Sequence, residues 1–277
     1  MEIWQSIVLG LVQGLTEFLP VSSSGHLSFF QNVLGVGSEN AQFISLVLHL
    51  GTLVAVCALF YKEIIALFKK PFKTLIYLIL ATIPAVVFGV IAAVLDIDEY
   101  FYNGPYAAIL LAVCFLITAG VLFATEIIAK KRERTLPLCY KTIIPMGLAQ
   151  ALAILPGISR SGSTICAGTI AGGRGEEVSK FSFLMSIPVI LGGFVLELGK
   201  GLYNGTLQAD FAANGGATYG WAIAIGFVCS AVAGLFAIKV MINVIKRADY
   251  KWFSLYLVLL AITCIVLHCT GTFHNTF

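Results

Sequence analysis

The chain has 277 residues, of which 59% are hydrophobic and 11% are Asp, Glu, Lys or Arg, and its formal net charge is +3. With a mean hydropathy of +0.95, it carries too little polar surface to cover a soluble globular protein of this length. The composition therefore excludes a soluble enzyme and predicts a single integral membrane domain over residues 1–277.

The first predicted element, residues 3–35, is apolar but is interrupted by Pro20-Val-Ser-Ser-Ser-Gly25. A membrane-spanning helix needs about 20 residues, and each half is shorter than that. Polar backbone at membrane depth is tolerated only where it is buried in protein or lines a watery cavity. We therefore expect a re-entrant helix-loop-helix hairpin whose loop is part of a working site.

Segments of spanning length follow in two groups of three, separated by a second interrupted stretch. The second stretch, residues 140–172, contains Pro156-Gly-Ile-Ser-Arg-Ser-Gly162 and predicts a second re-entrant hairpin. The fold class is thus an all-α polytopic membrane protein with two such hairpins and six full spans: 42–61, 75–95, 106–129, 178–198, 219–243 and 252–270.

The basic residues orient these spans. Fifteen of the seventeen Lys and Arg fall in connections on one side: Lys62, Lys69, Lys70, Lys73, Lys130, Lys131, Arg132, Arg134, Lys141, Arg174, Lys180, Lys239, Lys246, Arg247 and Lys251. The positive-inside rule assigns that side to the cytoplasm, so both termini are expected to face outward. The opposite connections carry Asp96, Asp98, Glu99, Lys200 and Asp210. Because the basic runs are split among short connections, no nucleic-acid partner is expected.

The two interrupted stretches repeat each other. Gly10-Leu-Val-Gln13 precedes Ser22-Ser-Ser-Gly25 with the same spacing by which Gly147-Leu-Ala-Gln150 precedes Ser159-Arg-Ser-Gly162. Three predicted spans separate the hairpins, so the halves 1–129 and 140–270 are predicted to be inverted-topology repeats. Their loops should then meet near the midplane of the bilayer.

The first hairpin supplies a carboxylate. Gln13 and Glu17 are four residues apart and share one face of a helix. An ionisable group at membrane depth usually faces a partner, a cavity or an ion, although a Glu near the interface can also simply reach water. Their oxygens could supply two ligands to Mg²⁺ or Ca²⁺, with water or substrate completing the shell.

The first loop also supplies hydroxyls and an imidazole. Ser22, Ser23 and Ser24 stand at a helix start, where they could cap free amides or bind an anion together with them. His26 lies one turn into that helix. It suits a general base, a general acid or a nucleophile, and a structural hydrogen-bond donor is the alternative.

The second loop supplies the positive charge. Arg160 needs an anionic partner at that depth, and a purely structural pair with Glu17 is one interpretation. Its five N–H donors, the adjacent hydroxyls and the free helix amides exceed what one carboxylate uses, and together they fit a phosphate or diphosphate. The candidate phosphate-binding residues are Ser22, Ser24, Ser159, Arg160, Ser161 and Thr164. With Glu17, a metal and a hydroxyl nucleophile, phosphoryl transfer is the reaction class indicated.

Both motifs also carry a family resemblance. Gln13-Gly-Leu-Thr-Glu-Phe-Leu-Pro-Val-Ser-Ser-Ser-Gly-His26 and Leu155-Pro-Gly-Ile-Ser-Arg-Ser-Gly-Ser-Thr164 resemble the signatures of the bacterial undecaprenyl-diphosphate phosphatases of the bacitracin-resistance type. The resemblance covers the whole chain. It implies removal of the terminal phosphate from undecaprenyl diphosphate, which recycles the lipid carrier for cell-wall synthesis. It also implies a requirement for Mg²⁺ or Ca²⁺ and a site toward the outer face of the cytoplasmic membrane.

By motif position, Glu17, Ser23, His26 and Arg160 are the expected catalytic residues. Gln13 and Glu17 match the family's acidic pair, and this chain has the Gln version. We expect Ser23 to be the nucleophile and His26 its base, while attack by His26 or by water stays open. The expected partners are a prenyl diphosphate substrate and membrane lipids, and a homodimer is left open.

An alternating-access anion carrier or lipid flippase is the rival function, because such carriers also use inverted repeats with broken helices. The halves differ in a way that favours a catalyst. Glu17 aligns with Ile154, and His26 aligns with Ser163. A symmetric carrier does not require one acidic half and one basic half. A purely structural subunit would leave Glu17 and Arg160 to be explained only as a mutual pair.

Overall fold

The computed structural model describes residues 2–36, 38–95, 97, 106–131, 133–203, 217–247 and 249–270. The described residues form helices and contain no β-strand, apart from an isolated bridge between Leu136 and Gly173. In chain order the helices are α1 (Ile3–Phe18), α2 (Ser23–Val33), α3 (Ser38–Leu59), α4 (Tyr61–Leu67), α5 (Lys73–Val94), α7 (Ala107–Lys131), α8 (Tyr140–Leu152), α9 (Arg160–Ile170), α10 (Gly175–Tyr203), α12 (Ala217–Arg247) and α13 (Lys251–Cys269).

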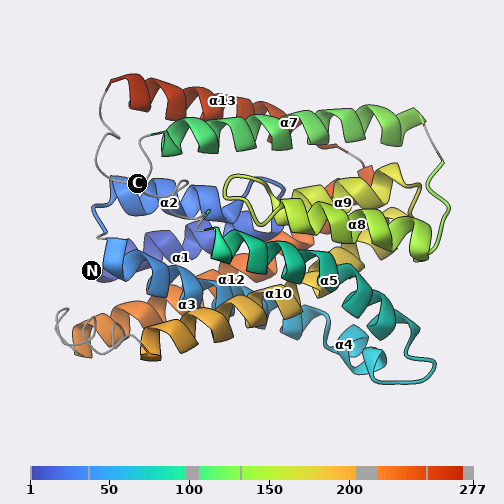
Figure 1. Ribbon diagram of the computed structural model, residues 1–277, viewed down its shortest axis with the longest axis horizontal. Coiled ribbons are helices and arrows are strands. Elements are labelled where there is room, and N and C mark those ends of the chain that lie inside the picture. Colours follow the sequence, from blue (N-terminus) through green and yellow to red (C-terminus); the bar gives the residue numbers. More distant parts are fainter. Residues whose placement is uncertain are drawn as a thin grey trace.

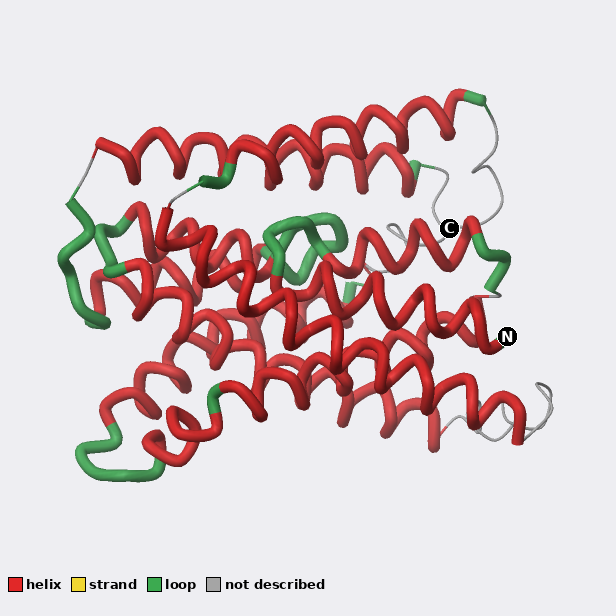
Figure 2. The backbone as a smooth tube through the Cα atoms, turned by 180° about the vertical axis from the view of Figure 1, so that it is seen from behind, coloured by secondary structure: helices red, strands yellow, loops and turns green. Residues whose placement is uncertain are grey.

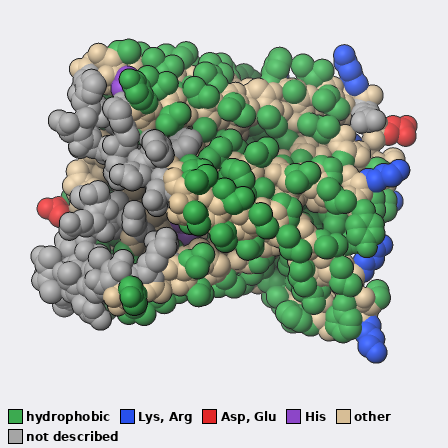
Figure 3. All heavy atoms as spheres, viewed as in Figure 1, with side chains coloured by type: hydrophobic (Ala, Val, Ile, Leu, Met, Phe, Trp, Pro, Cys, Tyr) green, Lys and Arg blue, Asp and Glu red, His purple; other side chains and the backbone are tan. Residues whose placement is uncertain are grey.

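The predicted membrane character is confirmed. Five described helices, namely α5, α7, α10, α12 and α13, are long and apolar enough to cross a bilayer, and α3 together with α4 makes a sixth candidate. Large apolar side chains cover much of the visible surface (Figure 3), and Val94 is 75% exposed. A soluble protein does not present so continuous an apolar surface. The chain is therefore a multi-pass membrane protein.

One helix was not predicted. The expected span 42–61 corresponds to α3, but the chain then turns by 81° into the short helix α4. Lys62 and Glu63 lie in α4 and end the apolar run, and Lys62 is one of the residues expected in the basic connection before α5. The chain turns back there toward the other helices (Figure 1).

Both interrupted stretches form the expected pairs of short helices. Leu19 after α1 is extended, with φ −73° and ψ 149°, because the residue before a proline disfavours the helical region. In the second stretch, Gly157 has φ +89°, and a Cβ there would lie 2.7 Å from the Cβ of Cys114. Only glycine meets both conditions, so the second break depends on that residue.

The loop between α8 and α9 lies in the middle of the molecule, whereas the connections α4–α5 and α7–α8 lie together at one end (Figures 1 and 2). The two interrupted stretches contact each other, as their repeat predicts. Ser161 Oγ donates a hydrogen bond to the Leu19 carbonyl at 3.0 Å, and a Cβ on Gly162 would lie 3.1 Å from the Cβ of Pro20. Residues far apart in the sequence are thereby brought to one place.

Helices from the first half of the chain pack on helices from the second half. Helix α1 packs on α12, and α8 packs on α5. Glycines allow the close approach in both cases, because a Cβ on Gly14 would lie 2.5 Å from the Ser230 carbonyl and one on Gly147 would lie 2.8 Å from the Ala81 carbonyl. Helices α7 and α13 pair with each other and form a separate layer (Figure 1).

The predicted sidedness rests on charge. In the view of Figure 3, the visible Lys and Arg side chains gather at the end that carries the connections α4–α5 and α7–α8. Of the residues expected in the basic connections, Arg132 lies outside the described residues. So do Asp96, Asp98, Glu99 and Asp210, which were expected on the opposite side.

Candidate functional site

The centre of the site is the Glu17 carboxylate, near the end of α1 and buried inside the protein. Its Oε1 accepts a hydrogen bond from Arg160 Nη2 at 2.5 Å. Its Oε2 accepts from Ser23 Oγ at 2.6 Å and from Gln13 Nε2 at 3.0 Å. Glu17 therefore joins the acidic helix, the serine loop and the second hairpin, and the structure brings together four of the predicted site residues.

A histidine outside both motifs also contacts the Glu17 carboxylate. His49 on α3 places Nε2 3.5 Å from Glu17 Oε2, and its Nδ1 donates to the Ser45 carbonyl at 2.6 Å. The sequence motifs gave His49 no role in the site. A polar residue inside an apolar helix was the available signal.

Arg160 is the first residue of α9. The preceding Ser159 caps this helix, because its Oγ accepts from the Gly162 N–H at 3.1 Å. Besides Glu17, the guanidinium reaches the Ser182 carbonyl on α10, from Nη1 at 3.4 Å. The two contacts hold Arg160 between α1 and α10, and a guanidinium has five N–H donors to share.

The serine loop is held in an uncommon backbone conformation. Ser22 has φ +66°, a region that residues other than glycine seldom adopt and that is often found at functional sites. Ser22 makes no side-chain cap for α2, and its hydroxyl lies 3.3 Å from that of Ser24. The equivalent serine of the other hairpin, Ser159, has an ordinary φ of −72° and does cap its helix. The expectation that a serine of the first loop acts as an ordinary N-cap is thus not met at Ser22.

The structure gives Ser23 a different partner from the expected one. Ser23 Oγ donates to Glu17 and not to His26. Both ring nitrogens of His26 are engaged elsewhere, Nδ1 with the Ser22 carbonyl at 2.8 Å and Nε2 with Tyr256 Oη at 2.6 Å. In this arrangement the group in place to receive the Ser23 proton is Glu17.

The remaining hydroxyl groups of the second loop form hydrogen bonds within the protein. Ser161 Oγ lies 3.3 Å from Ser159 Oγ and donates to the Leu19 carbonyl. Thr164 is fully buried, and its hydroxyl bonds to the Arg160 carbonyl at 2.8 Å and to the Ser182 hydroxyl at 2.7 Å. These contacts hold the first turn of α9, which begins with Arg160, against α10. Ser182 is a further residue that the sequence motifs did not indicate.

The oxygen atoms available as ligands in the site determine how a divalent cation could bind there. Gln13 Oε1 is buried and has no hydrogen-bond partner, so one neutral oxygen next to Glu17 is free to act as a ligand. No group of three or more His, Cys, Asp or Glu that could hold a metal occurs among the described residues. Gln13 and Glu17 alone could supply at most two ligands, so a cation here would also need oxygens of the substrate or water.

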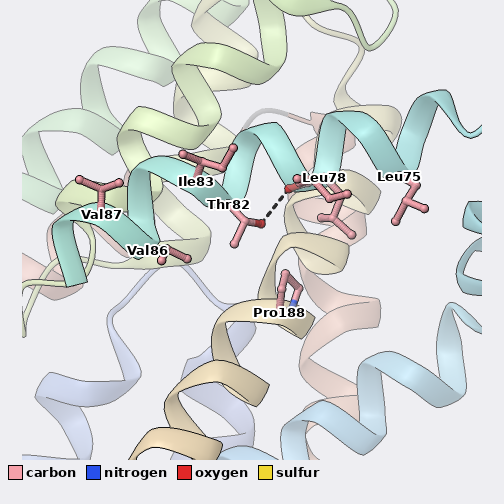
Figure 4. A pocket seen from close by; sticks show the side chains of 8 residues that line it. Leu75, Leu78, Thr82, Ile83, Val86, Val87 and Pro188 are labelled. Carbon is pink, nitrogen blue, oxygen red and sulfur yellow. Dashed lines mark hydrogen bonds between the residues drawn. The ribbon is translucent and has the colours of Figure 1, made fainter. Parts of the chain in front are cut away.

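A separate hollow lies away from this polar centre. A groove of about 390 Å³ runs along α5, lined by Leu75, Leu78, Ile79, Thr82, Ile83, Val86, Val87 and, from α10, Pro188. Its one hydroxyl, that of Thr82, already donates to the Leu78 carbonyl at 2.7 Å (Figure 4). A phosphate would find no donor there, so the groove is not the chemical site.

Comparison with known proteins gives a consistent result. The family described as bacitracin resistance protein BacA matches residues 6–263. An undecaprenyl-diphosphatase from Carboxydothermus hydrogenoformans is 38% identical over 99% of this chain and all of its own. Proteins of the same name from Rubrobacter xylanophilus and Methanobrevibacter smithii are 38% and 39% identical, each over 92% of this chain and 94% of their own length.

Proposed function

This chain belongs to the bacitracin resistance protein BacA family, and we propose from that membership and from its site that it hydrolyses undecaprenyl diphosphate to undecaprenyl phosphate and inorganic phosphate. It is a membrane hydrolase that recycles the lipid carrier for cell-wall synthesis. One observation carries the assignment to this site. A single carboxylate, that of Glu17, binds both a serine hydroxyl and the buried Arg160. A nucleophile and an anion-binding group thus both contact one proton acceptor.

Arg160 is the group that we propose binds the terminal phosphate. Its contacts with Glu17 and Ser182 leave further N–H donors of the guanidinium, which suit bidentate contact with phosphate oxygens. The N-terminus of α9 adds positive electrostatic potential at the same place. The hydroxyls of Ser22 and Ser24 supply further donors from the opposite loop.

We propose two chemical steps. In the first, Ser23 Oγ attacks the terminal phosphorus, its proton passes to Glu17, and the bond to the bridging oxygen breaks, so that undecaprenyl phosphate leaves with the electron pair. In the second, water attacks the phosphoserine and gives its proton to His26 Nε2. The Oγ–P bond breaks, Ser23 recovers its proton from Glu17, and His26 releases the proton of water to solvent as phosphate leaves. General acid–base catalysis of this kind contributes roughly 10²–10⁴ in rate.

A divalent cation, Mg²⁺ or Ca²⁺, is part of the proposal. Gln13 Oε1 and Glu17 would hold it together with oxygens of the diphosphate. When bound, such a cation neutralises charge on the transferring phosphoryl group. Since the protein offers so few ligands of its own, we expect the cation to bind strongly only with the substrate.

We further propose that the halves 1–129 and 140–270 form an inverted-topology repeat whose two hairpins are re-entrant and meet near the midplane. The exchanged packing of α1 on α12 and of α8 on α5 supports this symmetry. The gathering of Lys and Arg at one end supports a cytoplasmic face there. We place the protein in the cytoplasmic membrane with both termini outward and the site open toward the outer face.

The test is phosphate release from a prenyl diphosphate by the detergent-purified protein, with Mg²⁺, with Ca²⁺ and with chelator. We expect release that depends on the metal and that Glu17→Ala abolishes. The matched control is Glu126→Ala, since Glu126 is a buried carboxylate of α7 that binds Lys130 and the start of α13 instead. Folded wild-type protein that releases no phosphate under any of these conditions would favour the rival anion carrier or flippase.

A further inference from the structure

Tyr256, on α13, contacts the predicted catalytic histidine directly. Its Oη lies 2.6 Å from His26 Nε2. The two rings are also stacked, with centroids 5.6 Å apart and planes inclined by 16°. The two residues are separated by 230 positions in the sequence, and no motif or spacing pointed to Tyr256.

The hydrogen-bond inventory decides which nitrogen of His26 is basic. The Ser22 carbonyl can only accept, so the Nδ1 atom that faces it at 2.8 Å carries a proton. In a neutral imidazole the lone pair is then on Nε2, and the Tyr256 hydroxyl donates to it. After Nε2 takes up a proton, the same tyrosine oxygen can accept in return, so the contact survives both states of the ring.

Among the described residues, Tyr256 is the side chain that bonds to the basic nitrogen of His26. The other ring near it, that of Phe115 on α7, meets it edge-on at 6.0 Å. No ion pair involves His26 in the part of the chain that the structure describes. Tyr256 is 43% exposed while His26 is 3% exposed, so the tyrosine ring separates the imidazole from the surface of the protein.

We propose that Tyr256 is a positioning residue for His26: its hydroxyl holds the Nε2 lone pair in place until the attacking water takes over that contact, and its ring fixes the imidazole plane. The proposal rests on the phosphatase reaction proposed above. It adds a residue from the last helix to a site otherwise assembled from the two hairpins and α3, and it gives α13 a task beyond packing on α7.

The first test compares Tyr256→Phe, which removes only the hydroxyl, with Tyr256→Leu, which also removes the stacked ring. Loss of one ordinary hydrogen bond corresponds to roughly a fivefold change in rate, so we expect Tyr256→Phe to lower kcat about fivefold with KM unchanged. Tyr256→Leu should lower kcat further. The matched control is Tyr140→Phe, because the Tyr140 ring contacts Tyr77 and not the site. This control should leave kcat and KM at their wild-type values.

Two further readouts separate positioning from folding. In the His26→Gln background, Tyr256→Phe should cause no additional loss of kcat, because its effect acts through His26. In ¹⁵N-histidine NMR of the protein in detergent, the Nε2 signal that His26→Gln removes should shift when Tyr256 becomes Phe.

The proposal is overturned if Tyr256→Phe retains wild-type kcat and the wild-type Nε2 shift, or if it lowers kcat equally in the absence of His26. The NMR measurement needs no turnover. A wild-type protein that fails to hydrolyse prenyl diphosphates would therefore refute the proposed function, while the pairing of Tyr256 with His26 would still be tested separately.

Discussion

Replacing Glu17 by Gln removes one negative charge from the centre of the site and keeps the size of the side chain. In the native protein this carboxylate bonds to Arg160 at 2.5 Å and to Ser23 at 2.6 Å. The amide oxygen of Gln can still accept one hydrogen bond, but it cannot take up the Ser23 proton. The substitution therefore separates two roles of Glu17, proton acceptance and neutralisation of Arg160.

The two roles predict effects of opposite sign. Without the proton acceptor, kcat should fall by roughly 10²–10⁴. Without the negative charge, binding of a diphosphate in the presence of chelator, where the cation plays no part, should become tighter. Repulsion between unit charges about 5 Å apart at an effective dielectric constant of 20 is about 3 kcal/mol, and we expect at least a tenfold gain in affinity after relaxation. Arg160 also loses its buried partner, at a cost of about 3 kcal/mol in folding stability.

The assay combines phosphate release with calorimetric binding of a non-hydrolysable prenyl bisphosphonate, the binding being measured with chelator. Thermal unfolding should shift downward by roughly 6–12 °C. Glu126→Gln is the control, because Glu126 is a similarly buried carboxylate bonded to the backbone N–H groups of Tyr250 and Lys251. It should lower stability but keep hydrolysis within about tenfold of wild type. The reasoning is refuted if Glu17→Gln keeps more than a tenth of wild-type kcat, or if it binds the bisphosphonate more weakly.

Three further predictions follow from the same contacts. Arg160→Ala should remove nearly all phosphate release, whereas Arg160→Lys, which keeps the charge but loses the planar fork, should mainly raise KM; near-normal turnover in Arg160→Ala contradicts this assignment. Ser23→Ala should reduce kcat far more than Ser22→Ala in the same assay, and the reverse order would move the nucleophile to Ser22. Gly147→Ala places a Cβ 2.8 Å from a backbone oxygen of α5 and should lower unfolding stability by about 1–3 kcal/mol. Gly120→Ala, which meets open space, should not, and equal thermal shifts for the two glycine variants would show that the close approach is not tight.

Hydrophobicity and the two broken motifs determined the larger part of the fold. Apolar runs of spanning length can satisfy their backbone only as helices within a bilayer, and the observed helices begin and end within a few residues of the predicted ones. Pro20 marks the break in the first hairpin, and Gly157 allows the turn in the second. The short helix α4 was missed because its length and mixed composition give no signal that separates it from a connection.

The sequence also identified the residues of the site by type. A carboxylate, a cluster of hydroxyls, a histidine and an arginine inside apolar sequence are each costly unless they have partners. The repeat spacing predicted that the two loops meet, a pair of Glu17 with Arg160 was one interpretation, and the structure pairs them. That inference needed no coordinates, because only the opposite hairpin offered an opposite charge.

The tertiary structure alone decided how the groups divide their contacts. Ser23 and His26 are three residues apart and looked like a nucleophile and its base, yet Ser23 bonds to Glu17 and His26 bonds to Tyr256. His49 likewise reaches Glu17 from another helix. Local spacing describes neighbours on one helix, whereas these hydrogen bonds depend on how separate helices pack, and short-range sequence patterns carry no record of that packing.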